Sequence, residues 1–500
     1  MAMRAPGRAE LIELAALNHF ELSDEELSSF LPMVEAMVRG LDEIDRMPEP
    51  APTLKYYQRD PGVRPQPADD PLNAILRRCS VKGAATGRLA GKRIGVKDCV
   101  LVAGVPMSCG SLLLDGYIPD RDATIVTRML DEGAEIVAKL NMDDMAFSGS
   151  GDSSAFGAVL NPHNREHLSG GSSGGSGAAL YYEGIDMTIG GDQGGSIRIP
   201  ASFCGVVGLK PTHGLVPYTG IIGIDPTIDH TGPMARKVAD VALLLDVIAD
   251  PPAANGGARA GYSQGLETGV KGLRIGVVKE GFGWESSERD VDEAVRRALE
   301  AMAALGAQVE EVSIPLHRRS ARFLTGITSE GMAALIWGNG LVHHNHGPCN
   351  HHLSEAMGRA LRTHGNEMPR LLKLNLLLGT HLNRRYHGRI YGKAQNLRAH
   401  LRAQYDQALA RFDVLAMPTT PGKALRHEPK LDPQARLMRG WHVANNTAAF
   451  DVTGHPSLSL PCAKSHGLPV GLMLTGRHFD DTTLLRAAYA YEQNVAWEKV

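Results

Sequence analysis

The sequence predicts a layered α/β protein, because stretches typical of buried strands alternate with amphipathic helices. The first unit has a strand over 93–105, a helix over 123–132 with Asp122 as its N-cap, and a strand over 134–141. The same strand–helix–strand rhythm returns over 273–316. Repeated units of this kind place helices against a central sheet.

Length, composition and net charge limit the classes of protein to which this chain can belong. A chain of 500 residues, 43% hydrophobic and 21% charged, is typical of a folded protein with one large domain and additions, or two to three domains. The formal net charge of -3 argues against a nucleic-acid partner, which favours a strongly basic face.

Targeting and redox signals are also informative. The start of the chain lacks the apolar core and small-residue cleavage site of a signal peptide, and no apolar run is long enough to span a bilayer. We therefore expect a cytoplasmic protein with no membrane partner. The cysteines have no C-x-x-C spacing and are expected to be reduced and mostly buried, at positions 79, 99, 109, 204, 349 and 462.

Composition divides the chain into four segments. Residues 1–74 form a helical extension and linker, in which Ser23 and Glu26 make a capping box and 47–71 is a proline-rich, extended linker. Residues 75–316 are the first part of the core. A helical inserted subdomain follows over 317–410, and the second part of the core spans 411–500. Along the N-terminal helix, one apolar face is predicted to hold Leu27, Phe30, Leu31, Val34, Met37, Val38 and Leu41.

The stretch "GVKD" places Lys97 at the end of an apolar strand. A lysine at such a position either reaches the surface or pairs with Asp98, or it is desolvated. Desolvation lowers the pKa of an amine and makes it a usable base. Both interpretations stay open on this motif alone.

The run "LSGGSSGGSGAAL" over 168–180 matches the Gly-x-Ser-x-Gly nucleophile elbow, and it also resembles a flexible linker. The linker interpretation is weakened because apolar residues precede the run and a helix follows it directly. A glycine-rich turn that leads into a helix is a place where backbone approaches a ligand closely.

A third motif, "GGDQGGSIRIPASFCG" over 190–205, follows a predicted strand. Its turn presents consecutive backbone amides beside Ser196, which is the arrangement an oxyanion hole requires. An ordinary Asx-type turn is the alternative.

Together these motifs, with "GLPVGLMLTG" near the C-terminus, resemble the amidase signature family, and more narrowly its free-standing, nitrile-hydratase-associated bacterial amidases. The resemblance runs from about residue 75 to 500. It implies an amidase signature fold with a mixed central sheet flanked by helices. Lys97 and Ser172 are 75 residues apart, and Ser172 and Ser196 are 24 apart, as the family pattern suggests.

The resemblance also implies roles for individual residues. Ser196 corresponds to the nucleophile that forms an acyl-enzyme, Ser172 to a bridging serine after a cis Gly171–Ser172 peptide, and Lys97 to the base. The backbone amides of the implied oxyanion hole are those of Gln193, Gly194, Gly195 and Ser196. The implied reaction is hydrolysis of a linear carboxamide to a carboxylic acid and ammonia, without a cofactor.

Substrate contacts are expected from Ser148, Gly149 and the Gln193 side chain. At the position of Gln193, many family members have threonine or isoleucine. We expect the acyl pocket to be built from the insertion and from 141–160, a region that is apolar with small residues and therefore favours an uncharged aromatic or aliphatic acyl group. Hydrazide or anilide hydrolysis, and an amidotransferase A-type subunit that works with partner chains, are the alternatives. By the same resemblance, the N-terminal helices suggest a homodimer.

Histidines are abundant but are not needed for this chemistry. The cluster "HHNHGPCNHH" over 343–352 has no spacing typical of a zinc site, so we expect a polar loop and no metal. We assign structural roles to Arg198 and to the histidines at positions 213, 230, 455 and 478.

Overall fold

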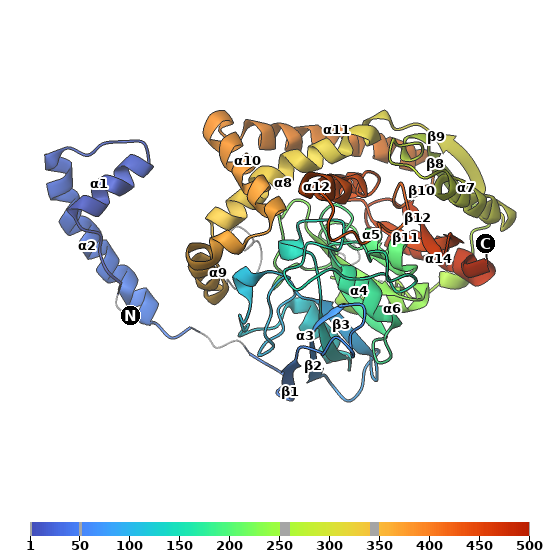
Figure 1. Ribbon diagram of the computed structural model, residues 1–500, viewed down its shortest axis with the longest axis horizontal. Coiled ribbons are helices and arrows are strands. Elements are labelled where there is room, and N and C mark those ends of the chain that lie inside the picture. The colour runs from blue at the N-terminus through green and yellow to red at the C-terminus, as the bar shows by residue number, and fades with distance from the viewer. Residues whose placement is uncertain (1–2, 50–52, 251–260, 341–349, 500) are drawn as a thin grey trace. The chain divides into compact units, whose positions relative to one another are not determined.

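The computed structural model describes residues 3–49, 53–250, 261–340 and 350–499. The chain forms two compact units, Met1–Thr53 and Leu54–Val500 (Figure 1). The predicted core segments and the predicted insertion all fall within the second unit. We keep 317–410 as a proposed subdivision of that unit.

The first unit consists of helices α1 (Arg8–Leu17) and α2 (Asp24–Arg46). The predicted capping box is confirmed at the start of α2: the Glu26 amide donates to Ser23 Oγ at 3.2 Å, and the Ser23 amide donates to Glu26 Oε2 at 2.8 Å. Much of the apolar surface of this unit is exposed, including Phe30, Met33, Met37, Leu41, Ile44 and Met47.

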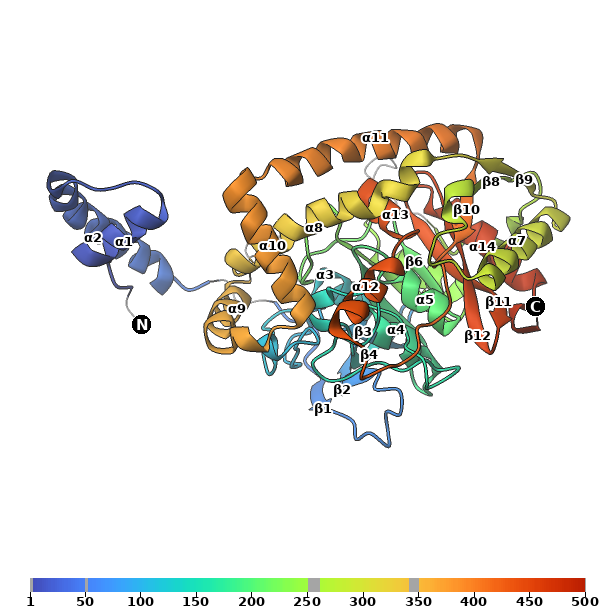
Figure 2. The ribbon, with the colours of Figure 1, turned by 45° about the horizontal axis from the view of Figure 1, so that its top comes forward.

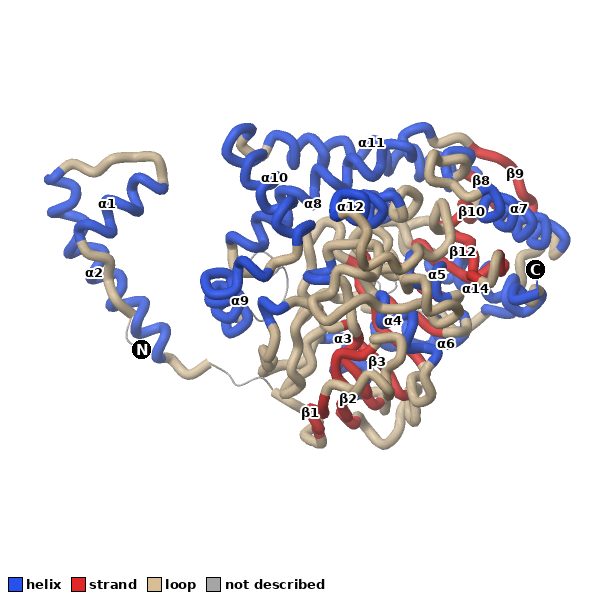
Figure 3. Tube along the Cα trace, viewed as in Figure 1, coloured by secondary structure: helices blue, strands red, loops and turns tan. Residues whose placement is uncertain are grey.

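The second unit is built on one mixed sheet of twelve described strands, which confirms the predicted α/β class (Figure 3). Their order across the sheet is β1-β2-β4-β3-β5-β7-β6-β11-β12-β10-β8-β9. The strands are β1 (Arg59–Val63), β2 (Ile75–Lys82), β3 (Arg93–Lys97), β4 (Glu135–Leu140), β5 (Met187–Asp192), β6 (Val207–Lys210), β7 (His230–Ala235), β8 (Arg274–Val278), β9 (Gln308–Val312), β10 (Val414–Pro418), β11 (Ser457–Ser465) and β12 (Leu468–Thr475).

Amphipathic helices cover this sheet with an apolar stripe at helical spacing. In α7, for example, Val291, Val295 and Met302 are buried while the polar face stays in solvent. The helices of the second unit are α3 (Thr124–Asp131), α4 (Gly174–Ala178), α5 (Arg198–Cys204), α6 (Val238–Ile248), α7 (Arg289–Ala304), α8 (Ser320–Trp337), α9 (His351–His364), α10 (Arg370–Tyr386), α11 (Arg389–Arg411), α12 (Pro433–His442), α13 (Ala448–Thr453) and α14 (Asp481–Asn494).

Helices α8, α9, α10 and α11 account for the described part of the predicted helical segment 317–410, with α11 ending one residue beyond it. Helix α8 packs against both α10 and α11, and Figure 2 shows the three side by side. Helix α8 also contacts α13 of the core, so this helical group is joined to the sheet unit by direct packing.

Several local predictions need correction. The strand predicted over 93–105 ends at Lys97, and strand β1 forms inside the predicted linker. Asp122 is not the N-cap of α3: Ala123 occupies that position without a side-chain bond. The Asp122 carboxylate instead pairs with Arg59 at 2.5 Å and accepts the Ala103 amide at 2.8 Å, because a buried guanidinium is the stronger partner.

None of the helices within the described ranges combines the length and apolar character that a bilayer crossing requires. The five described cysteines, at positions 79, 99, 109, 204 and 462, are free thiols buried in the core.

Candidate active site

Lys97 and the turn after Asp192 meet at one edge of the sheet. Strand β3 runs parallel to β5, with Val96 opposite Ile189. The carboxyl ends of parallel neighbours lie at the same edge, where α/β proteins usually bind ligands. Lys97 is the last residue of β3 and Asp192 the last of β5, so strand pairing alone brings these two segments together.

The Lys97 side chain is fully buried. Its Nζ donates to Ser172 Oγ at 2.7 Å and to the Gly191 carbonyl at 3.3 Å. Burial lowers the pKa of Lys97 below its ordinary value of 10.5, although acidic neighbours including Asp192 and Asp143 act in the opposite direction. A lowered pKa favours the neutral amine, which is the form that can accept a proton.

The glycine–serine run is a packed segment and not a linker. All residues from Leu168 to Leu180 are buried, and the Gly171–Ser172 peptide is cis. A side chain at Gly171 would place its Cβ 1.8 Å from Asp143 Oδ2, so only glycine fits there. The run therefore brings the Ser172 backbone into close contact with its neighbours, as the close-approach interpretation predicts.

The other serines of the run bond to backbone groups. Ser173 Oγ donates to the Gly191 carbonyl at 3.0 Å, and Ser176 Oγ donates to the Ile189 carbonyl at 2.9 Å. The Ser173 amide donates to the Ser196 carbonyl at 3.2 Å, which joins the run directly to the segment that carries Ser196.

The turn from Asp192 to Ser196 is held from both sides. The Gly195 amide donates to Asp192 Oδ1 at 2.5 Å, and Thr447 Oγ1 donates to the Gly194 carbonyl at 2.6 Å. Gly195 has a φ of +133°, and a Cβ at this position would lie 2.2 Å from Thr447 Oγ1. Glycine is required here both by the backbone conformation and by the close packing.

One member of the predicted oxyanion hole is thereby occupied. The Gly195 amide already donates its hydrogen bond to the Asp192 carboxylate. The amides of Gln193, Gly194 and Ser196 are the remaining candidates for binding a negative oxygen.

Arg198 fixes the position of this turn from the core. Its guanidinium donates to both Asp192 oxygens at 3.0 Å and to Asp451 Oδ2 at 2.6 Å, and all three side chains are fully buried. Burial acts to raise the pKa of Asp192, but the charge of Arg198 outweighs it and holds that pKa well below its usual range. The structural role expected for Arg198 agrees with these contacts.

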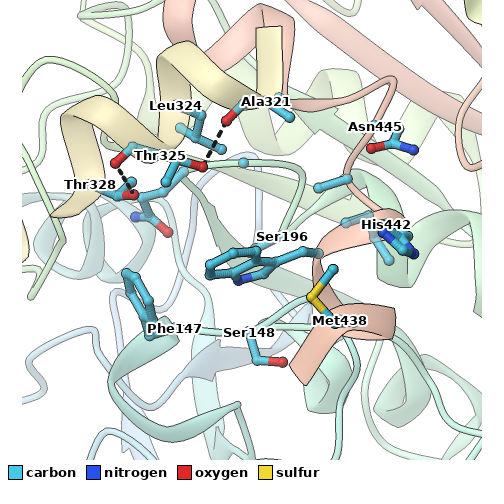
Figure 4. A pocket seen from close by; sticks show the side chains of 18 of the residues that line it. Phe147, Ser148, Ser196, Ala321, Leu324, Thr325, Thr328, Met438, His442 and Asn445 are labelled. Carbon is cyan, nitrogen blue, oxygen red and sulfur yellow. Dashed lines mark hydrogen bonds between the residues drawn. The ribbon is translucent and has the colours of Figure 1, made fainter. Parts of the chain in front are cut away.

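Ser196 lines a cavity of about 860 Å³ and is 7% exposed, while Lys97 and Ser172 are fully buried. Figure 4 shows Phe147, Ser148, residues of α8 and residues of α12 around Ser196. The three predicted substrate contacts, Ser148, Gly149 and Gln193, all line this cavity. Arg318, Arg322 and Asn375 also line it, and they belong to the segment 317–410 from which the acyl pocket was expected. Lining residues that sequence reasoning missed are Ile224, Trp284, Met438, Trp441, His442 and Asn445.

Gln193 is held in a defined orientation. Its Nε2 donates to the Tyr218 hydroxyl at 2.9 Å, and the side chain is nearly buried in the cavity wall. Among the described residues, its Oε1 has no hydrogen-bond partner. A buried amide oxygen without a hydrogen-bond partner carries a free-energy cost.

The predicted histidine loop cannot be compared with the structure, because most of 343–352 lies outside the described residues. His351 and His352 are described at the start of α9, with ring centroids 3.9 Å apart.

Comparison with known proteins identifies the class of protein to which this fold and site belong. The model of the Amidase family matches residues 71–485. This chain therefore belongs to the amidase signature family, as the sequence motifs indicate, and is an amidase-family enzyme that acts on amides.

The relatives of this chain include an amidase and subunits of an amidotransferase. The chain is 38% identical to an enantioselective amidase of Rhodococcus rhodochrous, over 97% of this chain and 95% of that protein. It is 39% identical to the A-type subunit of the glutamyl-tRNA(Gln) amidotransferase of Methanosarcina mazei, over 82% and 85%. The crystal structure of the A-type subunit from Thermotoga maritima superposes with a TM-score of 0.73 at 30% identity, covering 86% of this chain and 89% of that one.

Proposed function

We propose that this enzyme hydrolyses linear carboxamides to carboxylic acids and ammonia through a serine acyl-enzyme. The observation that carries the proposal is the 2.7 Å hydrogen bond from the buried Lys97 amine to Ser172 Oγ, directly behind the segment that presents Ser196 to the cavity. A neutral amine bonded to a serine hydroxyl is suited to remove a proton from a second serine.

In the proposed acylation step, Ser196 Oγ attacks the amide carbon as its proton passes to Ser172 Oγ. Ser172 passes its own proton to Lys97 Nζ. The C–N bond then breaks, and the proton returns from Lys97 through Ser172 to the leaving nitrogen, which departs as ammonia. Water attacks the acyl-enzyme by the same proton path, and the carboxylic acid leaves with Ser196 restored.

The negative oxygen of each tetrahedral intermediate needs donors fixed in advance. We assign this role to the amides of Gln193, Gly194 and Ser196, because the Asp192 carboxylate and Thr447 keep the turn in one conformation. The turn therefore needs little reorganisation when charge develops on the substrate oxygen.

The cavity wall supports an uncharged acyl group as the preferred substrate part. Phe147, Ile199, Ile224 and Leu324 supply apolar surface close to Ser196, while Arg318 and Arg322 are among the polar lining residues. We assign the Gln193 side chain to a contact with the substrate, and Ser148 and Gly149 to the wall around the acyl group.

The test offers the purified chain alone, without ATP or tRNA, a panel of aromatic and aliphatic amides with the matching hydrazides and anilides. Release of ammonia, hydrazine or aniline is measured, and hydroxylamine is added to trap the acyl group as a hydroxamate. Ammonia release with hydroxamate formation supports the proposal. Turnover confined to hydrazides or anilides would identify the chain as a hydrazide or anilide hydrolase of the same family. Activity that appears only with partner chains assigns the amidotransferase role, which similarity to the A-type subunits keeps as the second candidate.

We further propose that the N-terminal unit mediates a homodimer. Helix α2 leaves Met33, Met37, Leu41 and Ile44 exposed, each with at least 49% of its surface accessible. A long exposed apolar surface on a helix is typical of a protein–protein contact. Light scattering of the full chain should give twice the chain mass, and Met37→Glu combined with Ile44→Glu should give the monomer mass.

A further inference from the structure

A second group of polar side chains lies away from the proposed catalytic serines, where α11 meets the core. Asp406 comes from α11, His455 follows α13, and His478 follows β12. His455 Nε2 lies 3.0 Å from Asp406 Oδ1, and His478 Nδ1 lies 3.9 Å from the same oxygen. One ligand atom from each of the three side chains lies within 4.8 Å of the other two.

Thr453 orients both imidazole rings. Its hydroxyl donates to the Ala449 carbonyl at 3.0 Å, so its oxygen accepts from His455 Nδ1–H at 2.9 Å. Its carbonyl accepts from His478 Nε2–H at 3.1 Å. The nitrogens that face Asp406 are His455 Nε2, hydrogen-bonded to the carboxylate at 3.0 Å, and His478 Nδ1; a metal ion would replace the proton of that bond.

The three ligand atoms come from three separate segments of the chain and lie within reach of a single ion. Arg402 Nε approaches only the other carboxylate oxygen, Asp406 Oδ2, at 3.6 Å.

We propose that Asp406, His455 and His478 bind a divalent transition metal ion of the zinc type. Two imidazole nitrogens and one carboxylate oxygen are a typical three-residue set for such an ion, with water as the fourth ligand. The Asp406 side chain is 51% exposed, which leaves a solvent side for that water, and Thr453 provides the outer hydrogen bonds that fix metal-binding imidazoles. This proposal replaces the purely structural role and the absence of a metal expected from the sequence.

A metal at this position would tie α11 to the core segment around His455 and to the turn after β12. Helix α11 packs against α8, which lines the cavity, so the ion would stabilise a wall of that cavity without contacting substrate.

Cobalt titration of the chelator-treated full chain tests the proposal. We expect one Co²⁺ per chain, with visible d–d absorption that Zn²⁺ abolishes, and a rise in Tm of about 2 °C or more in excess Zn²⁺. Asp406→Asn and His478→Gln should remove the cobalt spectrum. Thr453→Val, which keeps the carbonyl but loses the hydroxyl, should weaken Co²⁺ affinity by about 10- to 100-fold.

His466→Gln is the matched control, because His466 also lies 3.9 Å from a carboxylate, that of Asp290, but is 81% exposed. This variant should keep the cobalt spectrum. The proposal is overturned if the wild type shows no stoichiometric Co²⁺ band, or if the band survives in both Asp406→Asn and His478→Gln. Circular dichroism identifies any variant that fails to fold, and Asp406→Asn on the exposed helix surface is the variant expected to fold in every case.

Discussion

Arg198 Nη2 donates to Asp451 Oδ2 at 2.6 Å, and this bond joins two residues that are 253 positions apart in the chain. The same guanidinium holds Asp192, which begins the turn that carries Ser196. The two core segments and the proposed nucleophile are thus connected through one buried cation.

Replacing Arg198 with methionine should destabilise the fold severely. The change leaves the Asp192 and Asp451 carboxylates buried without their cation, and breaking a buried pair typically costs about 3–5 kcal/mol. Urea unfolding measures the loss. Arg289→Ala is the control, because its pair with Glu293 is exposed and should change the free energy of unfolding by less than about 0.5 kcal/mol. Equal effects of the two substitutions would contradict the role given to Arg198.

Ser196→Ala should reduce kcat by at least about 10³-fold, because it removes the proposed attacking oxygen while the rest of the cavity stays in place. Ser176→Ala is the matched control, since Ser176 Oγ donates to the Ile189 carbonyl and its loss should affect stability more than turnover. Initial rates of ammonia release and thermal unfolding check both variants. Wild-type turnover in Ser196→Ala would contradict the proposed mechanism.

The rate should depend on pH through Lys97. Since burial lowers its pKa, kcat/KM of the wild type should fall as pH drops through that folded-state pKa and the amine becomes charged. Lys97→Met should give a strongly depressed rate that lacks this acid limb and rises with hydroxide concentration. The pH–rate profiles of both proteins show whether Lys97 is the group that titrates. An unchanged acid limb in the variant would assign that limb to another group.

Stability should also respond to pH at Lys97. Between the lowered folded pKa and the ordinary 10.5, the unfolded chain binds more protons at this residue than the folded chain. The free energy of unfolding therefore gains up to about 1.4 kcal/mol per pH unit from Lys97 as pH rises through this window. Lys97→Met loses this slope, so its stability relative to the wild type should be greatest at the low-pH end of the window. Parallel stability curves from urea unfolding would show that Lys97 is not desolvated.

Trp441→Ala should change substrate preference. Trp441 lines the cavity from α12, and its indole supplies a large apolar surface for an aromatic acyl group. We expect KM to rise about tenfold or more for an aryl amide and to change little for acetamide, with kcat conserved for the small substrate. Steady-state kinetics on the two substrates measure the difference, and an equal change for both would place the indole outside the acyl site.

The parts of the site that could be predicted are those encoded within short segments. Lys97 ends an apolar strand, and the glycines around Ser172 and Ser196 are needed for close backbone approach, so both features leave a local pattern. The capping box at Ser23 and the strand before Lys97 are predictable for the same reason. Long-range partners are not: Asp122 resembles an N-cap in sequence because nothing local indicates that Arg59 lies beside it.

The cavity wall is the least predictable part. Trp284, Met438 and Trp441 come from segments without a recognisable motif, and only the folding of the sheet unit brings them near Ser196. The sequence also does not reveal that the Gly195 amide is already hydrogen-bonded. Nothing in the motif shows that the Asp192 carboxylate accepts from this amide.

The turn that carries Ser196 and the residues that line the rest of the cavity come from different segments of the chain. The turn that presents Ser196 follows β5, whereas Ala321, Leu324 and Thr325 come from α8 and Met438 from α12. Substitutions or insertions in those helices can alter which molecules fit without disturbing the strand ends that hold Lys97 and Asp192. Such a division lets evolution diversify substrate choice at a constant chemical step, and it gives protein engineers separate regions to randomise and to leave untouched.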